Sequence, residues 1–269
     1  MWGGNGILQK PPGTPSWSLT MRIKFTDSFA LGTSIQDVKV PDALLLRHLT
    51  GVEWIDEALG GEGFTPSMVT MFTGEPGAGK TTALLTMASG LMENGAVCLF
   101  NTAEESLFQV KRTVNRLGLR GNFLVGGETN VDEIIKGADK IRARRENKGK
   151  PFFLMVDSLQ CLDDGNFSTG RITSMTAERS LEKLTTWAKE NFVNVIVIGQ
   201  VTKGGTFAGS NKMKHMVDCH MHLSWEKKDK DLLGHRKFAV EKNRFGGTGR
   251  TSWLAMGSDG FHVTAVEEN

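Results

Sequence analysis

Cysteine is scarce in this sequence, and its scarcity limits the kinds of protein that the sequence can encode. The 269 residues include only Cys98, Cys161 and Cys219, which lie far apart and form no C-x-x-C pair. Closely spaced cysteines are the usual sign of a structural zinc site, and an even number is usual in a disulfide framework. We therefore expect neither zinc nor disulfides, and a reducing cytoplasm is the simplest compartment.

Long apolar runs, a strong net charge and tyrosine are also missing. No apolar run approaches the roughly 18 residues of a membrane span, and no apolar core follows Lys10 as in a signal peptide. We expect no membrane partner and a place in the cytoplasm. The formal net charge is +2, so a nucleic-acid surface would have to be local. Without tyrosine, base stacking would fall to Phe or Trp.

One stretch, Gly-Glu-Pro-Gly-Ala-Gly-Lys-Thr at 74–81, matches the phosphate-loop pattern G-x-x-x-x-G-K-[ST] at every defined position. An apolar strand is expected before it at 67–73, and a helix after it at 82–93. Glycines let backbone N–H groups converge on phosphate oxygens, and a helix N-terminus adds donors and partial positive charge. Lys80 would reach the β- and γ-phosphates of ATP. The predicted nucleotide-binding residues are Gly74, Glu75, Pro76, Gly77, Ala78, Gly79, Lys80, Thr81 and Thr82.

Apolar runs alternate with amphipathic stretches along most of the chain, which predicts an α/β fold with a mostly parallel central sheet flanked by helices. Further strands are expected at 96–100, 122–125, 151–156, 193–198, 217–224, 236–242 and 252–256. Further helices are expected at 52–59, 107–117, 131–147 and 176–191. In such sheets, ligands bind at the carboxyl ends of the strands, where the polar motifs fall.

The chain divides into an N-terminal arm or linker over 1–48 and a motor domain over 49–269. The first 20 residues are rich in glycine and proline and favour neither helix nor strand. The segment 42–47 could form a short strand or a short helix. The arm could be a solvated tail, or it could dock on a neighbouring subunit, as in ring-forming ATPases.

Four acidic or amide side chains at strand ends supply the candidate chemistry. Asp157 ends the apolar run 151–156, where an aspartate of such ATPases holds Mg²⁺ through its water shell, with the Thr81 hydroxyl as a second ligand. Glu104 and Glu105 follow a strand that we expect beside the phosphate loop. A carboxylate there can orient and polarise the attacking water, and we favour Glu104 over Glu105. Gln200 could sense the γ-phosphate and signal to the next loop.

From about residue 50 to 254, the chain resembles the RadA/Sms branch of the RecA-like P-loop ATPases. The resemblance rests on the phosphate loop and on Thr-Gly-Val at 50–52, Ala-Glu-Glu-Ser at 103–106 and Val-Asp-Ser-Leu-Gln at 156–160. It continues through 201–209 and His-Met-Val-Asp at 215–218. The most specific piece is Lys-Asn-Arg-Phe-Gly at 242–246.

The resemblance implies an ATP- and Mg²⁺-dependent DNA motor of a bacterial or phage-infected cell, which forms a homo-oligomeric ring, a hexamer, on single-stranded or branched DNA. In that family Lys242 and Arg244 would project into the nucleotide site of the next subunit and stabilise transition-state charge. The loops 163–175 and 202–214 would face the central channel. Candidate DNA contacts in these loops are Arg171, Lys203, Phe207, Lys212 and Lys214.

The sequence departs from that branch because no four-cysteine zinc module precedes the core, no protease-like domain follows it, and Gln200 stands where histidine is frequent. Two other functions stay open, a recombinase-like filament that pairs DNA strands and a regulatory ATPase of the circadian-clock type without DNA. The cluster Arg142, Arg144 and Arg145 is either a solvated helix end or a further nucleic-acid contact.

Overall fold

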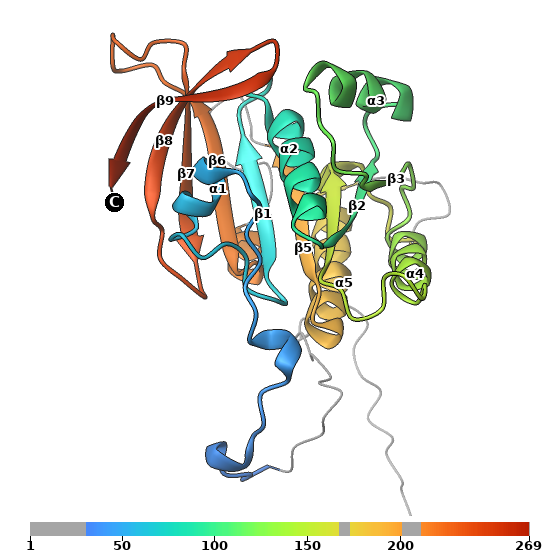
Figure 1. Cartoon of the computed structure of the whole chain (residues 1–269). Helices are drawn as coiled ribbons and strands as arrows, with labels where there is room; N and C mark the ends of the chain where they lie inside the picture. Colours follow the sequence, from blue (N-terminus) through green and yellow to red (C-terminus); the bar gives the residue numbers. More distant parts are fainter. Residues whose placement is uncertain (1–30, 167–172, 201–210, 269) are drawn as a thin grey trace, which may run out of the picture.

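A nine-stranded sheet forms the centre of the computed structural model, which describes residues 31–166, 173–200 and 211–268 (Figure 1). The strand order is β3-β2-β4-β5-β1-β6-β7-β8-β9. The strands are β1 (Val69–Gly74), β2 (Val97–Thr102), β3 (Leu124–Gly126), β4 (Phe152–Asp157), β5 (Asn194–Gln200), β6 (Cys219–Trp225), β7 (Arg236–Asn243), β8 (Arg250–Gly257) and β9 (Gly260–Glu268). Neighbours from β3 to β6 pair in parallel and those from β6 to β9 antiparallel, which confirms the predicted mostly parallel α/β sheet.

Helices cover both faces of the sheet and create two cores. The helices are α1 (Glu53–Ala58), α2 (Lys80–Glu93), α3 (Leu107–Arg116), α4 (Val131–Arg142), α5 (Ser174–Asn191) and α6 (Asn211–Met216). Residues of α1 and α2 pack with strand residues such as Phe72 on one face. Residues of α4, α5 and α6 pack with alternate strand residues such as Met71 on the other. Because successive strand side chains point to opposite faces, strands buried on both sides read as continuous apolar runs.

The strand order places the polar motifs at one edge of the sheet. β1 lies between β5 and β6, so the phosphate loop after β1 is adjacent to the end of β5 at Gln200. The expectation that the strand before Glu104 lies beside the phosphate loop was wrong, because β4 and β5 separate β2 from β1. The Glu104 side chain therefore approaches the phosphate loop across the ends of two intervening strands.

Two elements and the ends of two helices differ from the sequence-based expectations. Strand β9 was not anticipated, although the two residues Ser258 and Asp259, which stand before Gly260, form the short kind of turn that joins β-hairpins. Helix α4 ends at Arg142 rather than 147, where the Asn147 side chain donates to the Ile141 carbonyl at 2.9 Å and satisfies a free group of the last turn. Helix α5 begins at Ser174, and α6 occupies the end of the expected loop 202–214.

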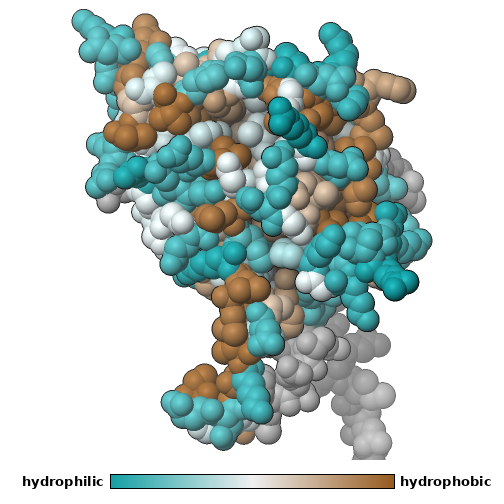
Figure 2. All heavy atoms as spheres, in the orientation of Figure 1, coloured by the Kyte–Doolittle hydropathy of each residue, from teal (hydrophilic) through white to brown (hydrophobic). Residues whose placement is uncertain are grey.

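The described part of the arm, residues 31–47, leads away from the sheet (Figure 1). It contains two single turns of 3₁₀ helix, at Ile35–Asp37 and Asp42–Leu44, so the segment 42–47 begins with a short helix of the 3₁₀ kind and forms no strand. A short antiparallel bridge between His48 and Phe64 joins it to the domain. Apolar side chains gather on this segment (Figure 2), and the exposed ones are Leu31, Ile35, Val40, Leu45 and Leu46.

Candidate nucleotide site

The phosphate loop makes a tight turn from β1 into α2. Gly74 lies so close to β6 that a Cβ atom would come 2.2 Å from the Leu223 carbonyl oxygen. Gly79, the residue before α2, has φ +105°, a conformation that L-residues with a side chain rarely adopt. A Cβ on Gly79 would also come 2.7 Å from Met256 and from Phe261. The two glycines are therefore required by the close approach of strands on either side.

Lys80 lies at the start of α2 with its ammonium group turned back into the loop. Its Nζ donates to the carbonyl oxygens of Gly74 and Glu75, at 2.8 and 3.1 Å. Burial lowers the pKa of Lys80, and the negative charges of Asp157 and Glu104 act in the opposite direction. The ammonium group thus lies within the field of two carboxylates that come from other strands.

Thr81 and Asp157 bring two hard oxygen ligands together. The Thr81 hydroxyl donates to Asp157 Oδ2 at 2.6 Å. Asp157 ends β4 and its residue is 4% exposed. Burial raises the pKa of Asp157 to about 6, and repulsion from Glu104 and Glu105 adds to the rise, against the Thr81 hydrogen bond and the charge of Lys80. Carboxylate and hydroxyl oxygens suit Mg²⁺, so these two residues fit a magnesium site.

Glu104 occupies the centre of the cleft, which Glu105 lines as well. Glu104 Oε1 accepts hydrogen bonds from Ser158 Oγ and from Gln200 Nε2, the latter at 2.7 Å. Glu105 instead uses its backbone, whose N–H donates to Thr102 Oγ1 at 3.0 Å. The carboxylate held by β4 and β5 side chains is therefore that of Glu104. The cleft is lined by Gly74, Pro76, Gly77, Gly79, Lys80, Thr81, Thr82, Glu104, Glu105, Asp157, Ile198 and Gln200.

Three residues around Glu104 were not predicted as site residues. Ser158 is fully buried next to Asp157, and Cys161 Sγ lies 3.5 Å from Glu104 Oε1. Gln160 accepts from the backbone N–H of Gln200 at 3.1 Å and so fixes the end of β5. All three follow Asp157 in the sequence, and the Asp-Ser-Leu-Gln run at 157–160 was the available signal.

Lys242 and Arg244 lie far from the phosphate loop of their own chain. Gly74 of β1 pairs with Leu223 of β6, whereas Asn243 of β7 pairs with Cys219 of β6. Leu223 and Cys219 are four residues apart on this shared strand. At about 3.3 Å per residue, this is a separation of roughly 13 Å along the sheet. Lys242 Nζ donates to the carbonyl oxygens of Lys214 and Val217, at 3.0 and 2.6 Å.

Arg244 forms an ion pair within its own chain. Its Nη1 lies 3.3 Å from Oδ1 of the buried Asp218, which also pairs with Lys189. The Arg244 side chain nevertheless remains 56% exposed. The geometry therefore excludes action on the chain's own phosphate loop and leaves the guanidinium open to solvent.

The predicted DNA contacts are only partly described. Arg171, Lys203 and Phe207 lie outside the described residues. Lys212 is exposed on α6 and pairs with Glu178 of α5. Lys214 offers its carbonyl to Lys242, as above, and is half-buried. The structure does not bring these residues together with the nucleotide cleft.

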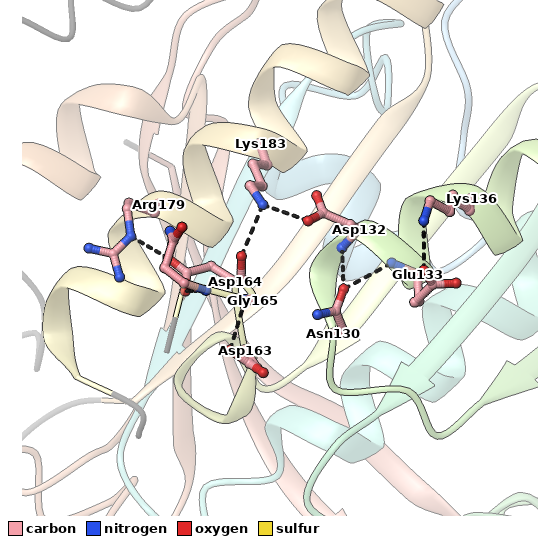
Figure 3. A network of polar contacts seen from close by, with 10 residues as sticks. Asn130, Asp132, Glu133, Lys136, Asp163, Asp164, Gly165, Arg179 and Lys183 are labelled. Atoms are coloured by element: carbon pink, nitrogen blue, oxygen red, sulfur yellow. Dashed lines mark hydrogen bonds and ion pairs between the residues drawn. The ribbon is translucent and has the colours of Figure 1, made fainter. Parts of the chain in front are cut away.

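A polar network links Asp163 and Asp164 to residues of α4 and α5 (Figure 3). Arg179 Nε pairs with Asp164 Oδ2, and Lys183 Nζ donates to the Asp164 carbonyl at 3.1 Å and to Asp132 at 2.7 Å. Burial would raise the pKa of Asp164, but hydrogen bonds from Arg179 and Asn166 outweigh it and hold the pKa at about 2. These contacts hold Asp164 against α5 and connect it through Lys183 to α4.

The basic cluster at the end of α4 is partly structural. Arg142 Nη1 donates to Asp139 and to Asn191, at 3.0 and 2.9 Å, and its guanidinium lies 5.8 Å from the Trp187 ring centroid. Arg144 and Arg145 are exposed. Arg142 therefore ties α4 to α5 and is a poor candidate for a nucleic-acid contact.

Comparisons with known proteins agree with this geometry. A family model described as the KaiC ATPase matches residues 48–150. The DNA repair protein RadA of Haemophilus influenzae is 36% identical over 217 residues, covering 80% of this chain and 44% of that protein. RadA of Aquifex aeolicus is 33% identical over 265 residues, covering 94% of this chain and 55% of that protein. The chain thus spans about half the length of these relatives.

A solved DnaB-like replicative helicase, from a study of its interactions with primase, superposes with a TM-score of 0.64 at 18% identity. The match covers 79% of this chain and 61% of the helicase, and at this identity it shows the fold alone. Fold and site together define a P-loop ATPase of the RecA-like class. Within that class, the chain carries a RadA-like ATPase core.

Within residues 31–166, 173–200 and 211–268, no helix has the length and apolar character needed to cross a membrane. The same part of the chain contains no group of three or more His, Cys, Asp or Glu side chains that could hold a metal ion by themselves. A magnesium ion at Thr81 and Asp157 would therefore need further ligands from the nucleotide or from water.

Proposed function

We propose that this chain hydrolyses ATP and uses the energy to move or remodel DNA as a homo-oligomeric ring. The observation that carries the proposal is the convergence of Lys80, Glu104 and Asp157 on one cleft around the phosphate loop. Each of the three comes from a different strand end, after β1, β2 and β4. This is the set of groups that phosphoryl transfer to water requires: a cation, a metal-holding carboxylate and a group that positions the water.

The roles follow from the contacts. Lys80 would exchange its carbonyl partners for β- and γ-phosphate oxygens, with backbone N–H groups of 74–82 around the phosphates. Glu104, held by Ser158 and Gln200, would orient and polarise the attacking water. Since Gln200 donates to Glu104, it would respond when a γ-phosphate competes for the same amide.

Thr81 and Asp157 would hold Mg²⁺, Asp157 through a water molecule. When bound, the metal supplies positive charge that neutralises the phosphate oxygens. Lys242 and Arg244 would act on the nucleotide of a neighbouring subunit, which their position away from their own phosphate loop supports. The exposed apolar side chains of the arm support a contact with another copy.

DNA as the partner is supported by the relatives and by charge. The two curated relatives are named DNA repair proteins, and the structural neighbour is a replicative helicase. Lys203, Lys212, Lys214 and Arg171 would contact phosphates of single-stranded or branched DNA, with Phe207 stacking on bases. The arm over 1–48 and the motor over 49–269 would form one subunit of the ring.

The test is ATP turnover with and without single-stranded DNA, in the wild type and in Lys80→Ala. We expect DNA to stimulate the wild type and Lys80→Ala to be inactive, because the phosphates lose their cation. Near-normal turnover of Lys80→Ala would contradict the assignment of the site. Turnover without any DNA stimulation would favour a regulatory ATPase of the KaiC type.

Two further readouts separate a motor from a recombinase-like filament. Unwinding of a forked duplex is expected only for a motor, and negative-stain images with an ATP analogue and single-stranded DNA distinguish rings from filaments. Filaments without unwinding would favour the strand-pairing alternative.

A further inference from the structure

A chain of buried hydrogen bonds runs from the phosphate loop to the strand that carries Lys242. We call it the histidine chain, and it consists of Thr73, His220, His222 and Glu241. Thr73 Oγ1 lies 2.7 Å from His220 Nε2 and 2.8 Å from His222 Nδ1. His220 Nδ1 lies 2.9 Å from Glu241 Oε2. Thr73 and His220 are 1% and 5% exposed, so the bond between them is shielded from water, whereas the Glu241 side chain is 46% exposed.

When both imidazoles are neutral, each hydrogen bond of the histidine chain has a definite donor and a definite acceptor. The hydrogen bond from His220 lowers the pKa of Glu241, which is therefore an acceptor at neutral pH. His220 must then carry its hydrogen on Nδ1, which leaves Nε2 to accept from the Thr73 hydroxyl. Because that hydroxyl has one hydrogen, His222 must donate to Thr73 from Nδ1. Both histidines thus take the Nδ1–H tautomer.

Charged groups around His222 agree with its neutral form. Burial is the largest cause that lowers the pKa of His222; Glu241 and Glu75 act to raise this pKa, and His220 and Lys214 act to lower it. A neutral His222 can donate from Nδ1 only if it is held in that tautomer, and Thr73 is its partner there. The order of hydrogens therefore depends on the threonine hydroxyl.

Both ends of the histidine chain are next to residues that have a role in the proposed mechanism. Thr73 directly precedes Gly74, whose carbonyl oxygen accepts from Lys80. Glu241 directly precedes Lys242, which holds the carbonyl oxygens at the end of α6. Thr73 belongs to β1, His220 and His222 to β6, and Glu241 to β7. Three adjacent strands are thereby locked in register just below the phosphate loop.

We propose that the histidine chain is a positioning device for ATP binding, which holds the entry of the phosphate loop against the strand that carries Lys242. The inference rests on the proposed function. None of its four residues lines the nucleotide cleft, and they act through the position of Gly74. The groups assigned to chemistry, Glu104 and Asp157, come from β2 and β4 and do not depend on it.

The test compares Thr73→Val, which removes the hydroxyl at nearly constant shape, with Thr73→Ser, which keeps it. We expect Thr73→Val to raise KM for ATP about tenfold with kcat within about threefold, and Thr73→Ser to stay within about twofold of the wild type. Calorimetric Kd for ATP should change with KM. The matched control is Thr264→Val, which removes an exposed threonine hydroxyl from β9 of the same sheet.

A second measurement shows directly which ring nitrogen of each histidine carries the hydrogen. Imidazole ¹⁵N spectra at pH 8 should show His220 and His222 as Nδ1–H tautomers in the wild type, and His222 should lose this preference in Thr73→Val. If Thr73→Val does not fold, Glu241→Gln at the 46% exposed end of the chain replaces it, with an expected rise in KM of about threefold.

Unchanged KM and Kd in the folded variants would overturn the proposal, even if the unfolding temperature falls. The histidine chain would then contribute to stability alone. Nε2–H tautomers for both histidines in the wild type would also overturn it. Because Kd is measured without hydrolysis, this test remains readable if the proposed DNA motor function fails.

Discussion

The proposed function needs Asp157 as a charged carboxylate, but its buried position disfavours the charge. Its pKa is raised to about 6, above the ordinary value of 3.8, so the folded state favours the protonated carboxyl. This stabilising contribution is complete below about pH 4 and is lost as the pH rises through 6. At pH 7.5 the ionised carboxylate costs the folded protein up to about 3 kcal/mol.

Asp157→Asn should therefore stabilise the protein while it abolishes hydrolysis. The amide is neutral and nearly isosteric, and its oxygen can still accept from Thr81. We expect Tm to rise by roughly 3–8 °C at pH 7.5, with the difference shrinking toward zero near pH 4. Thermal unfolding across this pH range, without nucleotide or Mg²⁺, is the measurement. A lower Tm of the variant at pH 7.5 would show that the carboxylate is compensated in the folded state.

Glu104 is the residue for which hydrolysis and binding should separate. Glu104→Gln keeps an oxygen that can accept from Ser158 but removes the charge that polarises water. We expect kcat to fall by about 10²–10³ while Kd for ATP changes by no more than about twofold. Single-turnover hydrolysis and ATP binding measure the two effects. Glu105→Gln is the matched control and should keep kcat, and the reverse pattern would move the role to Glu105.

At the level of elements, the sequence predicted best what depends on local pattern. Buried strands such as β4 read as apolar runs, and the phosphate loop is specified by glycines whose conformation or closeness to neighbours admits no side chain. The position of β2 relative to β1 was missed, because strand order depends on crossovers that no local pattern encodes. The prediction for Glu104 survived this error, since its carboxylate reaches the cleft across β4 and β5.

Contacts between distant segments could not be read from spacing. Ser158 was visible as part of a motif, but its hydrogen bond to Glu104 joins residues 54 apart. The His-x-His pattern at 220–222 has the period of a strand, yet only the pairing of β6 with β1 brings both rings to Thr73. Arg142 looked like part of a basic patch because its partners on α5 lie 45–49 residues away.

The segments 163–175 and 202–214 are those to which we assign DNA binding. Replacing Lys203 and Lys212 with Ala should weaken single-stranded DNA binding and reduce the slope of log K against log salt by about 1.4, since two fewer phosphates are neutralised. Binding titrations at several salt concentrations measure this slope. Lys136→Ala with Lys140→Ala, on α4, is the control of equal charge and should leave the slope unchanged.

An unchanged slope in the loop variant would place the DNA site elsewhere. Arg144 and Arg145 would then be the next candidates, because both are exposed, whereas Arg142 is held by Asp139 and Asn191. ATP turnover without DNA should be unaffected by either double substitution, since Lys136, Lys140 and Lys212 do not line the nucleotide cleft.

At the scale of the whole molecule, each chain has a phosphate loop and a pair of cationic side chains that lie too far away to contact a nucleotide bound there. Lys242 and Arg244 lie at the other end of β7 from the level of Gly74. Two adjacent copies could satisfy both, if the cations of one copy reach the nucleotide of the next. Supplied in this way, an arginine stabilises transition-state charge and makes hydrolysis depend on assembly.

Arg244→Ala should lower kcat by about 10³ and leave ATP binding by the same subunit's phosphate loop nearly unchanged. Asp218 keeps Lys189 as a partner, so the variant should fold. The deciding measurement mixes Arg244→Ala, which keeps its phosphate loop, with Lys80→Ala, which keeps its arginine. If Arg244 acts between subunits, mixed assemblies contain some interfaces with both groups intact, and turnover should exceed that of either variant alone. If native mass spectrometry shows mixed assemblies and turnover does not recover, Arg244 serves only its ion pair with Asp218.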